Sequence, residues 1–376
     1  MIFGVLILLG MLFVAYANGA NDNFKGVATL FGSGTADYRK ALWWATATTL
    51  LGSLTALFFS LKLVEMFQGK GLVPPTHTVS EPFVLSVVLG AALTVFAAAK
   101  AGIPISTTHS LTGALVGSGL SAAGSELGLA FLGKSFFLPL LLSPLASVAL
   151  VIAAYPLFRF AVARLGVTRE TCVCVGQEWV PIAALTPGAA TASSAAGLRV
   201  IVDQQAQCAQ RYSGTVFGVN AQSVLDACHY LSAGAVSFAR GLNDAPKIVA
   251  LGLSFGSWGL TQSVALVALA MAVGGLLDAR RVAETVSRKI TAMDHSEGFT
   301  ANLITSLLVI GASRWGLPVS TTHVSCGALF GIGAANGQAR WDVIRTILLA
   351  WLLTLPCAAI IAGVIYAVLS GTAVAW

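Results

Sequence analysis

Ten long apolar segments run through this chain and leave few ways for it to fold. They lie near residues 2–32, 39–62, 82–100, 106–122 and 129–163, and again near 223–253, 258–278, 297–313, 320–336 and 343–370. Only 10% of the residues are charged, whereas a soluble domain carries about 25%. About 20 apolar residues cross a bilayer as a helix, and lipid offers no partners to backbone polar groups. Because the runs are continuous and do not alternate, they favour an all-α polytopic membrane protein over a barrel.

The charge of the chain agrees with this class. Its net charge is +6, which in a soluble protein would raise the question of a nucleic-acid partner. In a membrane protein, an excess of Lys and Arg in the cytoplasmic loops accounts for most of such a charge. We therefore expect the lipid bilayer as a partner, no nucleic acid, and a multi-pass protein of the inner (plasma) membrane of a bacterium.

Two stretches of the sequence occur twice, in the same order. Residues 102–119 align with 316–333, and eleven of the eighteen positions are identical. Upstream, residues 18–25 align with 240–247, where Gly, Asn, Asp and Lys coincide. Internal repeats of this kind define an architecture. They divide the chain into a first transmembrane repeat (1–163), a linker with some local structure (164–222) and a second transmembrane repeat (223–376).

The distribution of charge predicts how the repeats are oriented. The linker is basic and is expected to be cytoplasmic, because it holds Arg164, Arg169, Arg199 and Arg211. The loop near 280–289 is also basic, whereas its counterpart near 63–81 holds Lys70 beside Glu65 and Glu81. Equivalent loops are therefore expected on opposite sides, which predicts inverted-topology repeats, as in many transporters. Each repeat then needs an odd number of spans, either five helices or three helices and one re-entrant hairpin.

A hydroxyl-rich motif, Pro-(Ile/Val)-Ser-Thr-Thr-His, occurs at residues 104–109 and 318–323. Proline starts helices well and Ser or Thr caps them, so each motif predicts a broken helix or a hairpin tip with a new N-terminus. Helix N-termini bind anions. The candidate ligands of one tetrahedral oxyanion are Ser106, Thr107, Thr108, Ser320, Thr321 and Thr322. The alternative is that these hydroxyls only cap or join helices, and His109 and His323 are expected to be structural hydrogen-bond partners.

The second repeated motif places carboxylates inside apolar runs. An ionised carboxylate at membrane depth is costly and indicates a functional site. Adjacent glycines, Gly19 and Gly241, favour local unwinding, and carbonyl, amide and carboxylate oxygens together suit Na⁺. The candidate cation ligands are Asn21, Asp22, Asn243 and Asp244. The alternative is that each Asp pairs with a nearby lysine, Lys25 or Lys247, and either lysine could also contact the anion.

Two further patterns have simpler explanations. Gly113 and Gly117, like Gly327 and Gly331, have the small-xxx-small spacing of close helix packing. In the linker, Cys172-x-Cys174 is expected to be a pair of ordinary thiols, because two ligands alone do not make a metal site; a metal or redox role is the alternative.

Together these motifs resemble the signature of the PiT family of inorganic phosphate transporters, over both repeats. The resemblance implies an inverted-repeat helical fold, phosphate held by the Ser-Thr-Thr helix ends, coupling to Na⁺ or H⁺, and a homodimer. Carried over by position, Asn21, Asp22, Asn243 and Asp244 match the cation site, and the six hydroxyl residues match the anion site. Two departures stand near these positions, because Asn23-Phe-Lys25 follows the first Asn-Asp and Pro246 precedes Lys247. Lys25 could therefore occupy a place where other members bind Na⁺.

The sequence thus predicts a secondary active transporter and no enzyme, since an enzyme gives no reason for duplicating a site. We expect inorganic phosphate to move with Na⁺ or H⁺, by alternating access around a site at the middle of the membrane, with Lys25 and Lys247 beside the anion. Sulfate or another tetrahedral oxyanion, carried by the same fold, is the alternative substrate. An anion channel is less favoured, because the helix breaks resemble occluding half-helices more than a continuous pore.

Overall fold

The computed structural model describes residues 2–168, 170–181, 192–204, 206–207, 212–253 and 259–371. Arg169 and Arg211, which we assigned to the basic linker, lie outside these ranges. The chain forms two compact units. The first unit combines Met1–Tyr155 with His229–Trp376, and the second comprises Pro156–Cys228.

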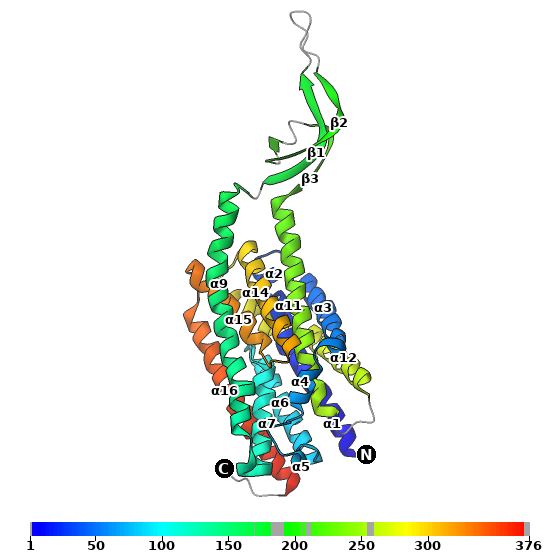
Figure 1. Ribbon diagram of the computed structural model, residues 1–376, viewed down its shortest axis with the longest axis vertical. Coiled ribbons are helices and arrows are strands. Elements are labelled where there is room, and N and C mark those ends of the chain that lie inside the picture. The colour runs from blue at the N-terminus through cyan, green and yellow to red at the C-terminus, as the bar shows by residue number, and fades with distance from the viewer. Residues whose placement is uncertain are drawn as a thin grey trace, which may run out of the picture. The chain divides into compact units, whose positions relative to one another are not determined.

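Helices build the first unit (Figure 1). The first repeat contains α1 (Ile2–Asp22), a 3-10 turn (Asn23–Val27), α2 (Ala28–Gly32), α3 (Tyr38–Phe59), α4 (Leu61–Phe67), α5 (Pro75–Thr78), α6 (Glu81–Ala101), α7 (Thr107–Ala123), α8 (Leu129–Leu132) and α9 (Leu138–Arg164). The second contains α11 (Ala221–Gly252), α12 (Leu260–Asp278), α13 (Arg280–Glu284), α14 (His295–Trp315), α15 (Thr321–Asn336) and α16 (Trp341–Ser370). Among the described residues, six helical segments are long and apolar enough to cross a membrane, which agrees with the predicted polytopic helical fold.

Each hydroxyl motif lies at the tip of a helical hairpin. Gly102 and Gly316 end α6 and α14 in the left-handed conformation, both with φ +72° and ψ +22°. This conformation suits glycine and stops a helix. Ser106 and Ser320 then cap the N-termini of α7 and α15 with nearly equal angles, φ −96° in both. In Figure 1 the α6–α7 hairpin lies in the lower part of the bundle and the α14–α15 hairpin in the upper part.

Small residues allow the hairpins to pack closely on long helices, as the glycine spacing predicted. A Cβ added to Gly117 of α7 would lie 1.9 Å from the carbonyl O of Ala359 in α16. In the second repeat, a Cβ on Gly331 of α15 would lie 3.0 Å from the carbonyl O of Val148 in α9. Each hairpin therefore packs, through its glycines, against the last long helix of one repeat.

The second unit holds a three-stranded antiparallel sheet in the order β2-β1-β3. Its strands are β1 (Thr171–Pro181), β2 (Ala192–Gln204) and β3 (Tyr212–Asn220). Cys172 and Cys174 are buried and pack against Ile201. Cys172 is a free thiol, but Cys174 is disulfide-bonded, so the expectation of two ordinary thiols is wrong for Cys174. In the part of the chain that the structure describes, no group of three or more His, Cys, Asp or Glu could hold a metal ion.

The close approach at Gly117 leads to a stability prediction. Gly117→Ala forces a methyl group against the Ala359 carbonyl, and overpacking of this kind costs about 1–3 kcal/mol. Gly311→Ala is the matched control, because a Cβ there meets only the Trp315 ring, at 4.0 Å. We expect thermal unfolding in detergent to occur at a lower temperature for Gly117→Ala and at an unchanged or higher temperature for Gly311→Ala. Equal unfolding temperatures would contradict the packing described here.

Candidate functional site

The duplicated motifs meet in the interior of the first unit. Asp22 ends α1, just before the 3-10 turn, and Asp244 lies within α11. Thr107 and Thr321 begin α7 and α15. These segments bring together five charged side chains, each no more than 5% exposed: Asp22, Lys25, Arg240, Asp244 and Lys247. We refer to these five residues as the buried charge cluster.

Glycines position the two Asn-Asp segments by allowing close contact with other helices. A Cβ on Gly19 would lie 2.0 Å from the carbonyl O of Met271, and one on Gly241 would lie 2.2 Å from that of Thr49. The backbone tightens into the 3-10 turn after Asp22, but α11 remains α-helical through Gly241. The unwinding expected beside Gly19 and Gly241 is therefore wrong, because both glycines lie within α-helix and serve helix packing.

Lys25 places its ammonium group among oxygen atoms from both repeats. Nζ donates to Oδ1 of Asn21 at 2.7 Å, to the carbonyl O of Ile105 at 2.8 Å and to Oγ1 of Thr322 at 2.7 Å. It also donates to Oδ1 of Asp22, with which it forms an ion pair. The alternative of an Asp–Lys pair is thus observed here, together with three further oxygen contacts.

Lys247 repeats this arrangement with fewer contacts. Its Nζ donates to Oγ1 of Thr108 at 2.8 Å and to the carbonyl O of Val319 at 2.9 Å. It lies 3.5 Å from Oδ1 of Asp244. Asn243 does not complete the set as Asn21 does, because its Oδ1 accepts from Oγ of Ser313 at 3.2 Å.

The hydroxyl residues divide into three roles. Oγ of Ser106 and Oγ of Ser320 cap their own helices by accepting from the backbone N–H three residues on, at His109 and His323, each at 3.1 Å. Thr107 donates to Asp22 at 3.0 Å, and Thr321 donates to Asp244 at 3.4 Å. Thr108 and Thr322 accept from the lysines of the opposite repeat. All six hydroxyl residues therefore lie at the starts of α7 and α15, and the four threonines contact the buried charge cluster.

Arg240 is a member of the cluster that our sequence analysis did not select. Its Nη1 donates to Oδ1 of Asn23 at 3.1 Å and its Nη2 donates to Oδ1 of Asn18 at 3.2 Å. Nε lies 3.9 Å from Oδ2 of Asp244 and has no hydrogen-bond partner. The available signal was an ionisable side chain inside an apolar run. It was overlooked because position 240 aligns with Asn18, so the repeat comparison showed no match there.

The two motif histidines stack beside the cluster. The rings of His109 and His323 have centroids 4.3 Å apart, and the His323 ring stacks on Trp351 at 3.8 Å. The indole Nε1 of Trp351 donates to the carbonyl O of Pro104 at 3.0 Å. Nδ1 of His109 and Nε2 of His323 are buried without a partner. The rings therefore join the two hairpins mainly by packing.

The charges of the cluster do not cancel. Three side chains are cationic (Lys25, Arg240 and Lys247) and two are anionic (Asp22 and Asp244), which leaves one positive charge. Uncompensated charge away from water is costly. The positive ends of α7 and α15 begin beside this cluster, so the region as a whole favours an anion.

The same contacts test whether a Na⁺ ion fits the predicted cation site. Amide, carboxylate, carbonyl and hydroxyl oxygens are the ligands that a hard cation takes; the first repeat supplies the first three kinds and Thr322 of the second repeat supplies the hydroxyl. Those oxygens already converge on Nζ of Lys25. The residues present therefore suit a cation, but the lysine ammonium takes the position that a Na⁺ ion would need.

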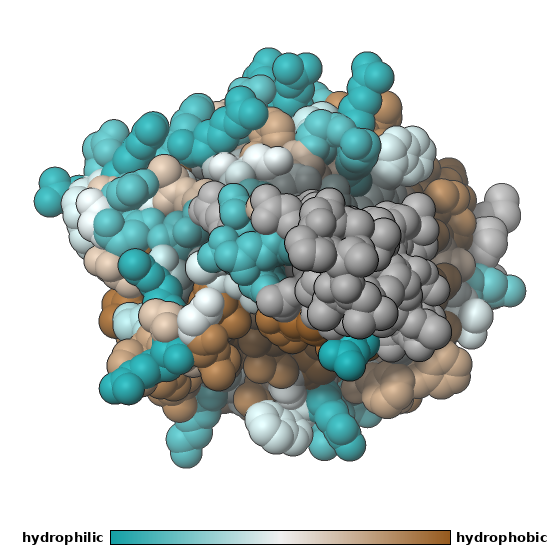
Figure 2. Space-filling model, turned by 90° about the horizontal axis from the view of Figure 1, so that it is seen from above, coloured by the Kyte–Doolittle hydropathy of each residue, from teal (hydrophilic) through white to brown (hydrophobic). Residues whose placement is uncertain are grey.

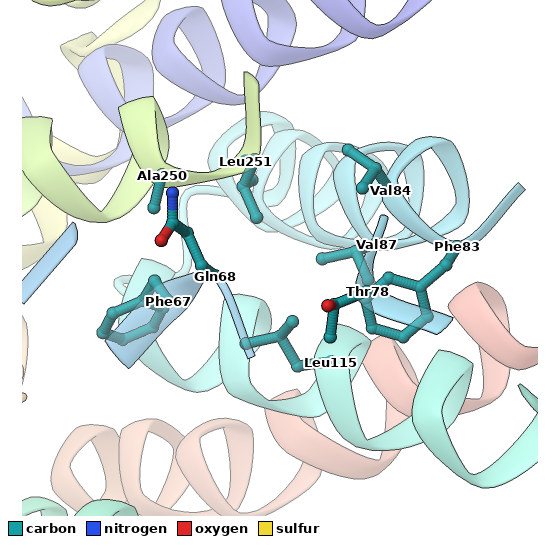
Figure 3. A pocket seen from close by; sticks show the side chains of 9 residues that line it. All are labelled: Phe67, Gln68, Thr78, Phe83, Val84, Val87, Leu115, Ala250 and Leu251. Carbon is teal, nitrogen blue, oxygen red and sulfur yellow. The ribbon is translucent and has the colours of Figure 1, made fainter. Parts of the chain in front are cut away.

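A pocket lies beside the end of α4, and Figure 3 shows the side chains that line it. Phe67, Gln68 and Leu251 are among the residues that line it. Phe67 is fully buried, and its ring centroid lies 5.8 Å from Nζ of Lys247. Phe67 thus lines the pocket and also lies beside the cluster.

Comparison with known proteins identifies relatives along almost the whole chain. Residues 18–362 match the sequence profile of a family described as the phosphate transporter family. A Pyrococcus furiosus protein, provisionally described as a phosphate permease, is 28% identical over 400 residues, which cover 96% of this chain and 95% of that protein. A Haemophilus influenzae protein with the same provisional description is 29% identical over 409 residues, which cover 95% of this chain and 94% of that protein. A solved structure described as the sodium-dependent phosphate transporter covers 98% of this chain and 99% of its own, with a TM-score of 0.75 and 22% identity. At this identity the likeness shows the fold.

The position of Arg240 leads to a prediction about anion binding. Arg240→Met keeps most of the side-chain volume but removes the guanidinium, and a hydrogen bond to a charged group contributes about 1.5–3 kcal/mol. We expect phosphate to bind purified protein roughly 10- to 100-fold more weakly, which follows from about 1.4 kcal/mol for each factor of ten. Arg280→Met is the control, because Arg280 is exposed and pairs with Glu284. Unchanged phosphate binding by a folded Arg240→Met variant would remove Arg240 from the anion site.

Proposed function

We propose that this chain, which belongs to the phosphate transporter family, is a secondary active carrier that moves inorganic phosphate by alternating access, driven by a cation gradient. The observation that carries the proposal is the buried charge cluster with its net positive charge, bordered by the starts of two helices. Such a cluster, enclosed within helices that can cross a membrane, supports anion translocation. The family consists of transporters, so the chain is not an enzyme.

The charge of the cluster also favours phosphate over sulfate. Near neutral pH phosphate exists partly as a monoanion, whereas sulfate is a dianion. One monoanion brings the cluster, with its single excess positive charge, to neutrality, and a buried dianion would leave one negative charge uncompensated. The anion ligands we propose are Ser106, Thr107, Thr108, Ser320, Thr321, Thr322, Lys25, Lys247 and Arg240.

Alternating access rests on the relation between the repeats. The caps at Ser106 and Ser320 have the same geometry, and each lysine contacts a threonine of the opposite repeat. These features support inverted-topology repeats around one shared site, as in other secondary carriers. We retain the homodimer implied by the family resemblance as a prediction, which light scattering of the protein–detergent complex can check.

Charge supports an orientation with the linker in the cytoplasm. Thr35 hydrogen-bonds His295, and the backbone N–H of Arg340 donates to the carbonyl O of Ile290, so these loops gather at one end. Exposed basic residues on the segments of this end include Arg39, Lys40, Arg280, Arg288, Lys289 and Arg340. Figure 2 shows hydrophilic side chains gathered at the end seen from above. The opposite end, where the backbone N–H of Gly128 donates to the carbonyl O of Leu72, holds Lys70 and Lys134. The larger number of basic residues marks the cytoplasmic end.

Transport in proteoliposomes tests the proposed function. With an inward cation gradient, we expect labelled phosphate to accumulate above its external concentration, and unlabelled phosphate to compete better than equal sulfate. Accumulation separates a carrier from a channel, because a channel cannot concentrate an anion against its own gradient. Preference for sulfate would overturn the substrate assignment, and equilibration without accumulation would overturn the carrier.

Maleimide labelling tests the orientation. Lys40→Cys and Lys70→Cys each place a thiol at an exposed site, at opposite ends of the first unit. In intact cells, we expect a membrane-impermeant maleimide to label Lys70→Cys, and to label Lys40→Cys only after permeabilisation. The reverse pattern would place the linker outside the cytoplasm.

A further inference from the structure

The environment of Lys25 is that of a bound metal cation. Its ammonium is held by an amide oxygen, a carboxylate oxygen, a main-chain carbonyl and a hydroxyl. An ammonium has three N–H donors and no acceptor, so four converging oxygens satisfy it fully. The side chain is 5% exposed. The ammonium is therefore an integral, well-bonded part of the site.

Lys247 occupies the related position in the second repeat. Lys25 contacts the carbonyl of Ile105, which precedes Ser106, and Lys247 contacts the carbonyl of Val319, which precedes Ser320. Each lysine also bonds the second threonine of the opposite hairpin, Thr322 or Thr108. Both positions thus share a carbonyl, a threonine hydroxyl and a carboxylate, and an ammonium lies in each of them.

A free Na⁺ ion would have to displace these groups to enter. Displacement of Lys25 would leave an ammonium without its four acceptors in the interior, and an unpaired buried charge is strongly unfavourable. Two added Na⁺ ions would also raise the charge of the cluster from one positive charge to three, and so repel one another and the three cationic side chains. Both effects act against Na⁺ before any anion has bound.

We infer that the ammonium groups of Lys25 and Lys247 are tethered, resident cations that take the place of two metal ions, so that this chain binds its anion without Na⁺. The inference rests on the proposed function only in treating the buried charge cluster as the anion site. Na⁺ and H⁺ are the two cations considered for coupling. The inference excludes Na⁺ from the positions of the Lys25 and Lys247 ammonium groups.

Purified full-length protein in detergent allows a direct test by Na⁺ binding. Thermal unfolding is compared in NaCl and in choline chloride at equal ionic strength, and binding of ²²Na⁺ is measured in parallel. For the wild type we expect the same unfolding temperature in both salts and no saturable ²²Na⁺ binding. Lys25→Ala vacates the oxygen cage, so we expect saturable ²²Na⁺ binding and an unfolding temperature that rises with NaCl, as a ligand of the folded state requires.

Two variants control for loss of charge and for loss of an ion pair. Lys25→Met removes the ammonium but keeps the cage filled, and we expect no response to Na⁺. Lys100→Ala removes an ion pair with Asp278 outside the buried charge cluster, and it should behave as the wild type does. A response that is confined to Lys25→Ala identifies the emptied cage as the Na⁺ site.

The outcomes separate this inference from the proposed function. Na⁺-specific stabilisation or ²²Na⁺ binding of the wild type overturns the inference, as does a folded Lys25→Ala variant that ignores Na⁺. If Lys25→Ala folds only in NaCl, the inference is supported. If it folds in neither salt, the inference stands when the wild type shows no saturable ²²Na⁺ binding and fails when it shows such binding. Labelled phosphate binding is measured on the same samples. Absence of phosphate binding alongside the expected Na⁺ results would overturn the proposed function and leave the resident cations established.

Discussion

Mutual compensation of charges in an apolar interior is the constraint on which the centre of this protein depends. Asp22 and Asp244 are each almost fully buried, and neither could remain ionised there without cations and donors around it. Lys25 supplies the cation to Asp22 through a direct ion pair, while Asp244 has Lys247 and Arg240 within 4 Å. Because five charged groups share one small volume, removal of any one changes the environment of the others.

The hairpins bring polar backbone groups to the buried charges. Membrane interiors tolerate non-helical backbone only where the protein itself encloses it. The turns after Gly102 and Gly316 expose the carbonyls of Ile105 and Val319, and these carbonyls accept from the two lysines. An uninterrupted helix would have used the same carbonyls internally. The breaks therefore free these carbonyls to act as ligands, and the glycine caps lower the free-energy cost of ending each helix.

The sequence allowed the membrane fold and most members of the buried charge cluster to be predicted, because both depend on local patterns. Apolar length predicts helices, and duplication reveals Asp22, Lys25 and their counterparts without any structure. The crossed contacts, such as Lys25 with Thr322, depend on how the hairpins pack, which no local pattern encodes. Arg240 was overlooked because the repeats were compared for identical residues, and the first repeat has Asn18 at the position of Arg240. The disulfide at Cys174 was also unpredictable, because spacing alone does not determine pairing.

The difference between Asn18 and Arg240 has a physical reason. The two residues occupy equivalent repeat positions, and their side chains meet, with Nη2 of Arg240 donating to Oδ1 of Asn18 at 3.2 Å. Two arginines could not meet there, because a guanidinium has no acceptor and like charges at this distance repel. Asn18 instead accepts from Arg240 and donates through Nδ2 to Asp22 at 2.9 Å and to Asp244 at 3.3 Å. One amide thus links both carboxylates to the guanidinium. Exact duplication therefore fails at this contact between the repeats, and the mismatch leaves one unopposed positive charge for an anion to neutralise.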